Sequence, residues 1–73
     1  MTETRLTVPE MSCDACRATI EGALGGLPGV AAVSVDLDRK LVTVEHDDCA
    51  TPVDRLAAAV EEQGYEVAGR EAP

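Results

Sequence analysis

The spacing of apolar residues limits what this chain can fold into, because it switches between a period of two and a helical period. Residues 4–8 alternate apolar with polar side chains and stop at a proline, which predicts a strand. Residues 14–25 carry an apolar stripe at helical spacing, with Ser12 as the expected N-cap. Residues 30–37 and 41–45 alternate again and predict a β-hairpin. The first part of the chain therefore predicts strand, helix, strand and strand.

A second helix is expected after residue 50, with the clearest start signal in the sequence. Residues 51–54 read Thr-Pro-Val-Asp, which places a cap residue, a proline at the first helical position and a carboxylate at the third. Gly64 ends this helix, and residues 65–68 predict a last short strand. We expect residues 70–73 to form a frayed tail.

The predicted order is β-α-β-β-α-β, which is the α+β ferredoxin-like sandwich or split βαβ arrangement. We expect a four-stranded antiparallel sheet in the order 4-1-3-2, with two helices on one face and with Val42 and Val44 pointing inward. A length of 73 residues allows one modest core, so we expect a single domain over residues 1–73 with its core at about 4–69. The chain has no Trp, no Phe and one tyrosine, so that core must be aliphatic. Little room remains for a catalytic pocket, which argues against an enzyme.

The charge balance excludes one large class of partners. The chain carries 14 acidic and 6 basic residues, for a net charge of −8. Nucleic-acid binding requires the opposite sign, whereas this balance fits plain solubility or an electropositive partner surface. Neither a signal peptide nor a membrane-spanning segment is predicted, so we expect a cytoplasmic protein with no direct membrane insertion. The initial methionine and short polar ends favour a complete protein over an excised domain.

Residues 11–16, Met-Ser-Cys-Asp-Ala-Cys, include the two side chains best suited to metal binding or redox chemistry. The thiolates of Cys13 and Cys16 can converge on one soft metal ion or form one disulfide. In a reducing cytosol, metal binding or redox catalysis is more common for this spacing than a structural bridge. Both cysteines lie where the first strand passes into the first helix, and a helix N-terminus favours thiolate over thiol. Two partly exposed thiolates suit a low-coordinate soft ion such as Cu(I).

His46 and Cys49 offer an alternative, because together with Cys13 and Cys16 they would make a four-ligand zinc set. The predicted topology opposes this structural zinc module, since it places residues 46–51 at the other end of the sheet. We expect His46 to be an exposed residue at a strand end. We expect Cys49 to be a small residue packed ahead of the second helix.

The sequence around residues 11–16 resembles the heavy-metal-associated domain family, in particular small bacterial copper chaperones and the metal-binding domains of P-type ATPases. Leu-Pro-Gly-Val at residues 27–30, the hairpin strands and Glu-Gln-Gly-Tyr-Glu-Val at residues 62–67 match its later landmarks. The resemblance covers roughly residues 4 to 69. The chain departs from the family where Pro9-Glu10 precedes the methionine, since the family usually has a glycine there.

This resemblance implies specific roles for four residues. Cys13 and Cys16 would bind the metal, Met11 would pack beneath the loop without ligating, and Tyr65 would lie beside the metal loop. Ser12, before the first cysteine, resembles the copper members, whereas zinc-exporting relatives tend to carry Asp at that position. The implied ion is therefore Cu(I).

The resemblance also implies a function. The chain would be a cytosolic Cu(I) chaperone that passes its ion to a partner by stepwise thiolate exchange. The partner would be a copper-exporting P-type ATPase or a copper-sensing repressor. We expect a monomer in the metal-free form, with a copper-bridged dimer as an open alternative. An Hg(II) or Zn(II) carrier of the same fold, or a domain excised from an ATPase, is the competing interpretation.

Overall fold

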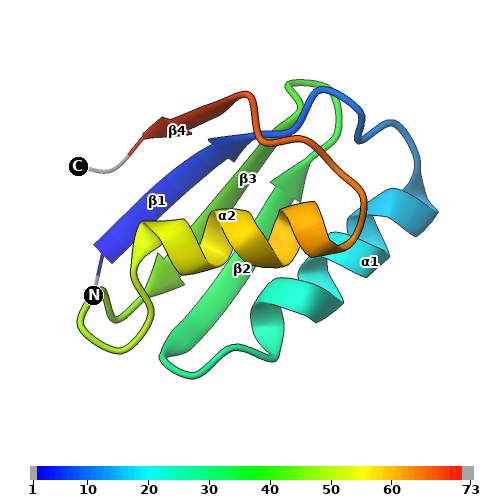
Figure 1. Ribbon diagram of the computed structural model, residues 1–73. Helices are drawn as coiled ribbons and strands as arrows, with labels where there is room; N and C mark the ends of the chain where they lie inside the picture. The colour runs from blue at the N-terminus through cyan, green and yellow to red at the C-terminus, as the bar shows by residue number, and fades with distance from the viewer. Residues whose placement is uncertain (1, 72–73) are drawn as a thin grey trace.

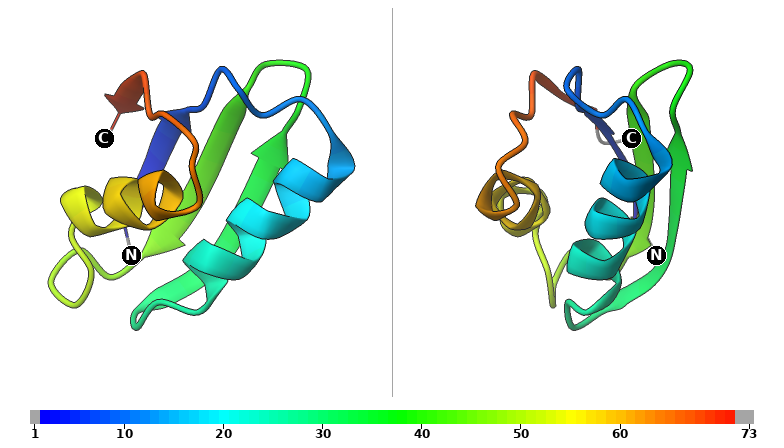
Figure 2. Two further views of the ribbon diagram at one scale, coloured as in Figure 1. Left: turned by 45° about the vertical axis from the view of Figure 1, so that its right-hand side comes forward. Right: turned by 90° about the vertical axis from the view of Figure 1, so that its right-hand side faces the viewer.

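The computed structural model describes residues 2–71 and contains a single four-stranded sheet with two helices (Figure 1). The elements are β1 (Thr2–Thr7), α1 (Asp14–Gly25), β2 (Val30–Asp36), β3 (Leu41–His46), α2 (Val53–Glu62) and β4 (Gly69–Glu71). All neighbouring strands are antiparallel, and their order is β2-β3-β1-β4. Both helices cover the same face of the sheet (Figure 2). The predicted ferredoxin-like fold and strand order are confirmed.

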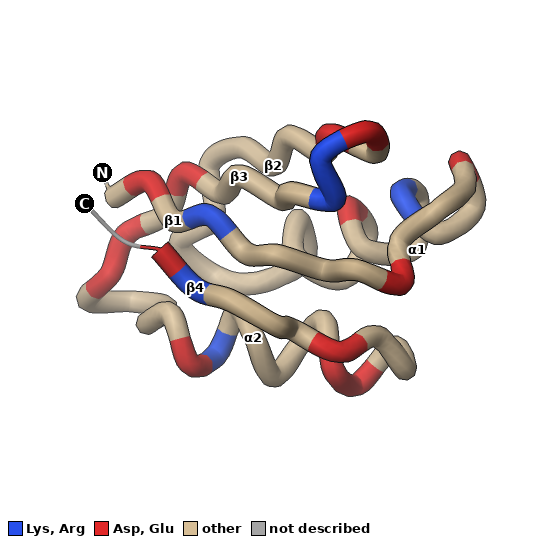
Figure 3. The backbone as a smooth tube through the Cα atoms, turned by 90° about the horizontal axis from the view of Figure 1, so that it is seen from above, with Lys and Arg blue, Asp and Glu red and all other residues tan. Residues whose placement is uncertain are grey.

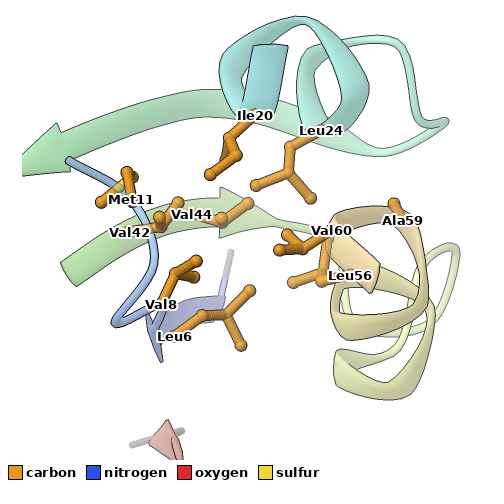
Figure 4. Packing of buried hydrophobic residues seen from close by; sticks show 10 residues of the cluster. All are labelled: Leu6, Val8, Met11, Ile20, Leu24, Val42, Val44, Leu56, Ala59 and Val60. Atoms are coloured by element: carbon orange, nitrogen blue, oxygen red, sulfur yellow. The ribbon is translucent and has the colours of Figure 1, made fainter. Parts of the chain in front are cut away.

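The core lies between this face of the sheet and the helices, and it is built almost entirely from aliphatic side chains (Figure 4). Its buried members are Leu6, Val8, Met11, Ile20, Leu24, Val42, Val44, Leu56, Ala59 and Val60. The strands contribute alternate residues and the helices contribute residues at helical spacing, as each period requires. Val42 and Val44 are fully buried, so the predicted inward pair of β3 is confirmed.

The last strand differs from the prediction. Residues 65–68 are irregular, and β4 pairs only with residues 5–7 of β1. The cause lies in β1, which ends at Thr7 just before the turn that Pro9 begins. Apart from one backbone bond, from the Ala68 N–H to the Thr7 carbonyl, residues 65–68 therefore pair with no strand, and the ladder starts at Gly69. The predicted frayed tail is consequently wrong for residues 70 and 71, which belong to β4, while residues 72–73 lie outside the described part of the chain.

The N-cap of each helix lies one residue later than the cap residue predicted from sequence, although α1 itself begins at Asp14 as predicted. The N-cap of α1 is Cys13 rather than Ser12, and the N-cap of α2 is Pro52 rather than Thr51. Neither cap makes a side-chain hydrogen bond. The Thr51 hydroxyl instead donates to the backbone carbonyl of Pro28, because the threonine is buried where the loop before α2 meets the turn before β2.

Candidate metal-binding site

The loop between β1 and α1 is held in place by its backbone. The N–H of Val8 donates to the carbonyl of Lys40 at 2.9 Å, and the N–H of Met11 donates to the carbonyl of Val8 at 3.1 Å. The second bond closes a tight turn whose second residue is Pro9, a position that suits the fixed φ of proline. The turn directs the Met11 side chain into the core, where it is fully buried. Met11 thus anchors the start of the loop from beneath.

Cys13 and Cys16 follow this anchor and lie at the first turn of α1. Cys13 has an extended backbone as the N-cap, and its carbonyl accepts the first helical hydrogen bond, from the Arg17 N–H at 3.1 Å. The two Sγ atoms are 3.0 Å apart, and both cysteines are free thiols. Cys13 is exposed, whereas Cys16 is half-buried and packs against the core. The pair is therefore asymmetric, with one sulfur supported by the core and one on the surface.

The environment of Cys16 favours its thiolate. Its pKa falls from the ordinary 9.0 to about 7, chiefly because the Cys13 thiol donates a hydrogen bond to it. The Tyr65 hydroxyl lowers the pKa of Cys16 in the same way, and hydrogen bonding by the Ser12 backbone adds to the effect. Because the thiols share a hydrogen bond, the titration belongs to the pair. Cys16 thus has substantial thiolate character at neutral pH.

Tyr65, the only aromatic residue of the chain, lies half-buried in the segment between α2 and β4 and packs against the core. Its hydrogen bond to Cys16 raises the pKa of the phenol, since the interaction keeps the hydroxyl protonated. The structure therefore brings Tyr65 to the cysteines from a distant part of the sequence.

Arg17, the cation next to Cys16 in the sequence, is paired with carboxylates. Arg17 lies 3.3 Å from Asp14 Oδ1 and 3.5 Å from Glu21 Oε1, so its charge is shared with carboxylates. Seen from above, acidic and basic positions are interspersed around the β1–α1 and β2–β3 connections (Figure 3). The lowered pKa of Cys16 consequently arises from hydrogen bonds rather than from a neighbouring cation.

The alternative ligands do not join the pair. His46 is fully buried, which contradicts the expected exposed position. Its Nε2 is 2.7 Å from Thr4 Oγ1 and its Nδ1 is 2.8 Å from the Thr51 carbonyl, so both ring nitrogens are engaged. Cys49 is exposed rather than packed, because it lies on a turn that projects beyond the start of α2. Within residues 2–71, no three His, Cys, Asp or Glu side chains are grouped so as to hold a metal ion.

The sulfur separation defines what the pair can do. With metal–thiolate bonds of about 2.3 Å, a linear two-coordinate ion holds its sulfurs about 4.6 Å apart. The observed 3.0 Å is shorter, so a linear ion requires the sulfurs to separate by about 1.6 Å. Cys13 is free to make that movement, since only Cys16 packs against the core. The pair can thus open toward solvent without disturbing the core.

Sequence reasoning missed one contact next to this pair. Glu10 Oε1 accepts a hydrogen bond from the backbone N–H of Glu66 at 3.1 Å, and thereby joins the turn before Met11 to the segment that contains Tyr65. No local pattern links residues so far apart. The one available signal was a glutamate at the position where the resembling family usually has glycine.

The chain is similar in sequence and in fold to known proteins of one family. The chain matches the heavy-metal-associated domain family over residues 5–66. A copper chaperone CopZ of Staphylococcus haemolyticus is 44% identical over 62 residues, which make up 85% of this chain and 91% of the relative. A solved CopZ metallochaperone has a TM-score of 0.86 and 37% identity, and the match covers 89% of this chain and 97% of that one.

A third relative is the N-terminal domain of a potential copper-translocating P-type ATPase from Bacillus subtilis, solved in its Cu(I)-loaded state. It has a TM-score of 0.84 and 34% identity, and the match covers 97% of this chain and 92% of that one. Within residues 2–71, neither helix has the length and hydrophobicity to cross a membrane.

Proposed function

The chain belongs to the heavy-metal-associated domain family, and on that premise we propose that it is a cytoplasmic copper chaperone and not an enzyme. It carries one Cu(I) ion between Cys13 and Cys16 and hands it to a partner. The observation that carries the proposal is the thiol pair itself, with sulfurs 3.0 Å apart and no third acidic, His or Cys ligand grouped with them among residues 2–71. A two-thiolate site of this kind suits a soft, low-coordinate ion, whereas structural zinc takes four ligands.

Transfer follows from the unequal exposure of the two sulfurs. A thiolate of the partner approaches the ion from the surface and forms a third copper–sulfur bond. The bond to the exposed Cys13 then breaks, while Cys16 keeps its bond until a second partner thiolate replaces it. No electron is transferred, and each released thiolate regains a proton from solvent. Copper is never free during the exchange.

Two neighbouring residues support this chemistry without binding the ion. The Tyr65 hydroxyl lowers the pKa of Cys16, so it favours the thiolate form that binds metal. Met11 is fully buried beneath the loop and fixes where the cysteines begin. Its thioether therefore acts as a packing group.

The proposed partner is a copper-transporting P-type ATPase. The support is the similarity of this chain to the N-terminal domain of such a potential ATPase. A domain of the same fold that carries Cu(I) can approach this chain at the end where Cys13 is exposed. A copper-sensing repressor is the second candidate partner.

Cu(I) stoichiometry under reducing conditions tests the proposal. We expect one ion per chain for the wild type and for the matched control Cys49→Ser, because Cys49 does not lie at the site. We expect Cys13→Ser and Cys16→Ser each to lose tight binding. Loss of binding in the Cys49 variant, or Cu(I) binding no tighter than Zn(II) in a competition experiment, would overturn the assignment.

A further inference from the structure

The position of Tyr65 depends on a short segment with few attachments. Residues 65–68 belong to no strand, and they follow Gly64, whose positive φ of 90° ends the turn after α2. Two of their backbone N–H groups bond to the β1 side of the molecule. The N–H of Ala68 donates to the carbonyl of Thr7 at 2.8 Å, and the N–H of Glu66 donates to Glu10 Oε1 at 3.1 Å.

The second bond is the one adjacent to Tyr65. Side chains alternate along this segment, with Tyr65 half-buried toward the core and Glu66 exposed. Fixing the Glu66 amide therefore fixes the residue before it. Glu10 itself is exposed on the turn that precedes Met11, so it connects the cysteine loop directly to the tyrosine segment.

We propose that Glu10 is a positioning residue, which holds Tyr65 against Cys16 by binding the Glu66 backbone. This inference rests on the proposed function, because it concerns how the same site holds its ion. It also gives a role to a carboxylate that lies three residues before Cys13 in the sequence, where its charge alone is unfavourable for metal binding. The carboxylate serves as an acceptor for a backbone amide. Tyr65, once in place, packs against the same core as Cys16, which is the more buried of the two cysteines.

The contribution of Glu10 is local. Glu66 and Glu10 are both exposed, so when the carboxylate is removed, water can accept from the freed amide. We therefore expect Glu10→Ala to leave the unfolding midpoint in urea nearly unchanged. An unchanged unfolding midpoint would distinguish a positioning role of Glu10 from a general contribution to stability.

The first measurement uses metal-free protein. The chain has one tyrosine, no phenylalanine and no tryptophan, so the Tyr65 ring signals in NMR spectra have to be distinguished only from those of His46. Glu10→Ala should weaken the nuclear Overhauser effects between the Tyr65 ring and the Cys16 β-protons, and should speed hydrogen exchange of the Glu66 amide. Glu10→Gln keeps an acceptor oxygen without the charge and should retain both signatures. Unchanged signals in Glu10→Ala would overturn the proposal.

The second measurement is the rate of Cu(I) release to an excess of a Cu(I) chelator. Glu10→Ala and Tyr65→Phe should each speed release by roughly 2–10-fold, as expected for one lost hydrogen bond. Because Glu10 acts through Tyr65, the double variant should be no faster than Tyr65→Phe. Additive effects, or a Glu10→Gln variant as fast as Glu10→Ala, would contradict positioning and indicate a charge effect. If the wild type binds no Cu(I), the proposed function fails, while the metal-free measurement still decides the role of Glu10.

Discussion

Replacing His46 by alanine tests whether the end of the sheet opposite the cysteines is held by a buried polar network. The imidazole lies between Thr4 on β1 and the carbonyl of Thr51 before α2. A carbonyl only accepts, so Nδ1 carries a hydrogen, and in the neutral ring Nε2 accepts from the Thr4 hydroxyl. Thr51 in turn donates to the Pro28 carbonyl. The side chains of His46 and Thr51 together thus join two strands and two loops.

The expected loss of stability is large for a chain of this size. His46→Ala leaves the Thr51 carbonyl and the Thr4 hydroxyl without partners, and both residues are buried. Each unsatisfied buried group costs about 1–3 kcal/mol, so the two groups together cost about 2–6 kcal/mol before any cavity term. A domain of 73 residues has a total free energy of unfolding of roughly 4–11 kcal/mol. The variant should therefore be close to unfolding at 25 °C.

His46→Asn separates the two bonds, because its amide nitrogen can take the place of Nδ1 while nothing replaces Nε2. We expect about half the loss of the alanine variant. Urea unfolding followed by far-UV circular dichroism measures both, since the chain lacks tryptophan. Glu45→Ala, an exposed neighbour on β3, is the control and should stay within about 0.5 kcal/mol of wild type. A His46→Ala variant whose free energy of unfolding lies within about 1 kcal/mol of wild type would refute the proposed role of the buried polar network. Loss of Cu(I) binding by folded His46→Asn would instead support the four-ligand zinc site.

Two further predictions concern the cysteine end and the turn before β2. The alkylation rate of Cys16 by iodoacetamide should rise with pH through a midpoint of about 7, because the thiolate reacts. The pKa of Cys16 is lower in the folded state, so the contribution of its ionisation to stability is complete above the ordinary pKa of 9.0. That contribution is lost as the pH falls through about 7. An alkylation midpoint near pH 9 would contradict the lowered pKa. Gly29→Ala should destabilise by about 1–3 kcal/mol in urea, because Gly29 has φ of 79° and an added Cβ would lie 2.9 Å from Ala50 Cβ. Gly25→Ala, which meets nothing within 4 Å, is the matched control, and equal effects of the two substitutions would be inconsistent with this explanation.

The fold was predictable because each element has a clear period and a clear stop signal. The prediction failed where distant parts of the chain decide the outcome. Residues 65–68 alternate as a strand should, yet β1 ends too early to pair with them beyond the single bond from Ala68 to Thr7. The contact between Glu10 and Glu66 likewise depends on the assembled fold. Sequence periodicity carries no information about such pairings.

His46 is a different case, since its burial was visible in the sequence. It follows Val42 and Val44 at the same period of two, so the alternation itself places it on the inward face. The prediction of an exposed His46 followed the usual preference of histidine for the surface and not this alternation. For the cysteine pair, the spacing predicted proximity. Spacing could not reveal which sulfur packs against the core, because that depends on how α1 lies on the sheet.

The unequal burial of Cys13 and Cys16 has a consequence for how a carrier reconciles tight binding with quick delivery. Equilibrium affinity depends on both sulfurs, but the lifetime of the loaded state in the presence of a partner depends on the weaker-held one. In the proposed transfer, an exposed Cys13 would give an incoming thiolate an associative route that bypasses dissociation into water. A carrier that works in this way would be inert toward solvent and labile toward its target.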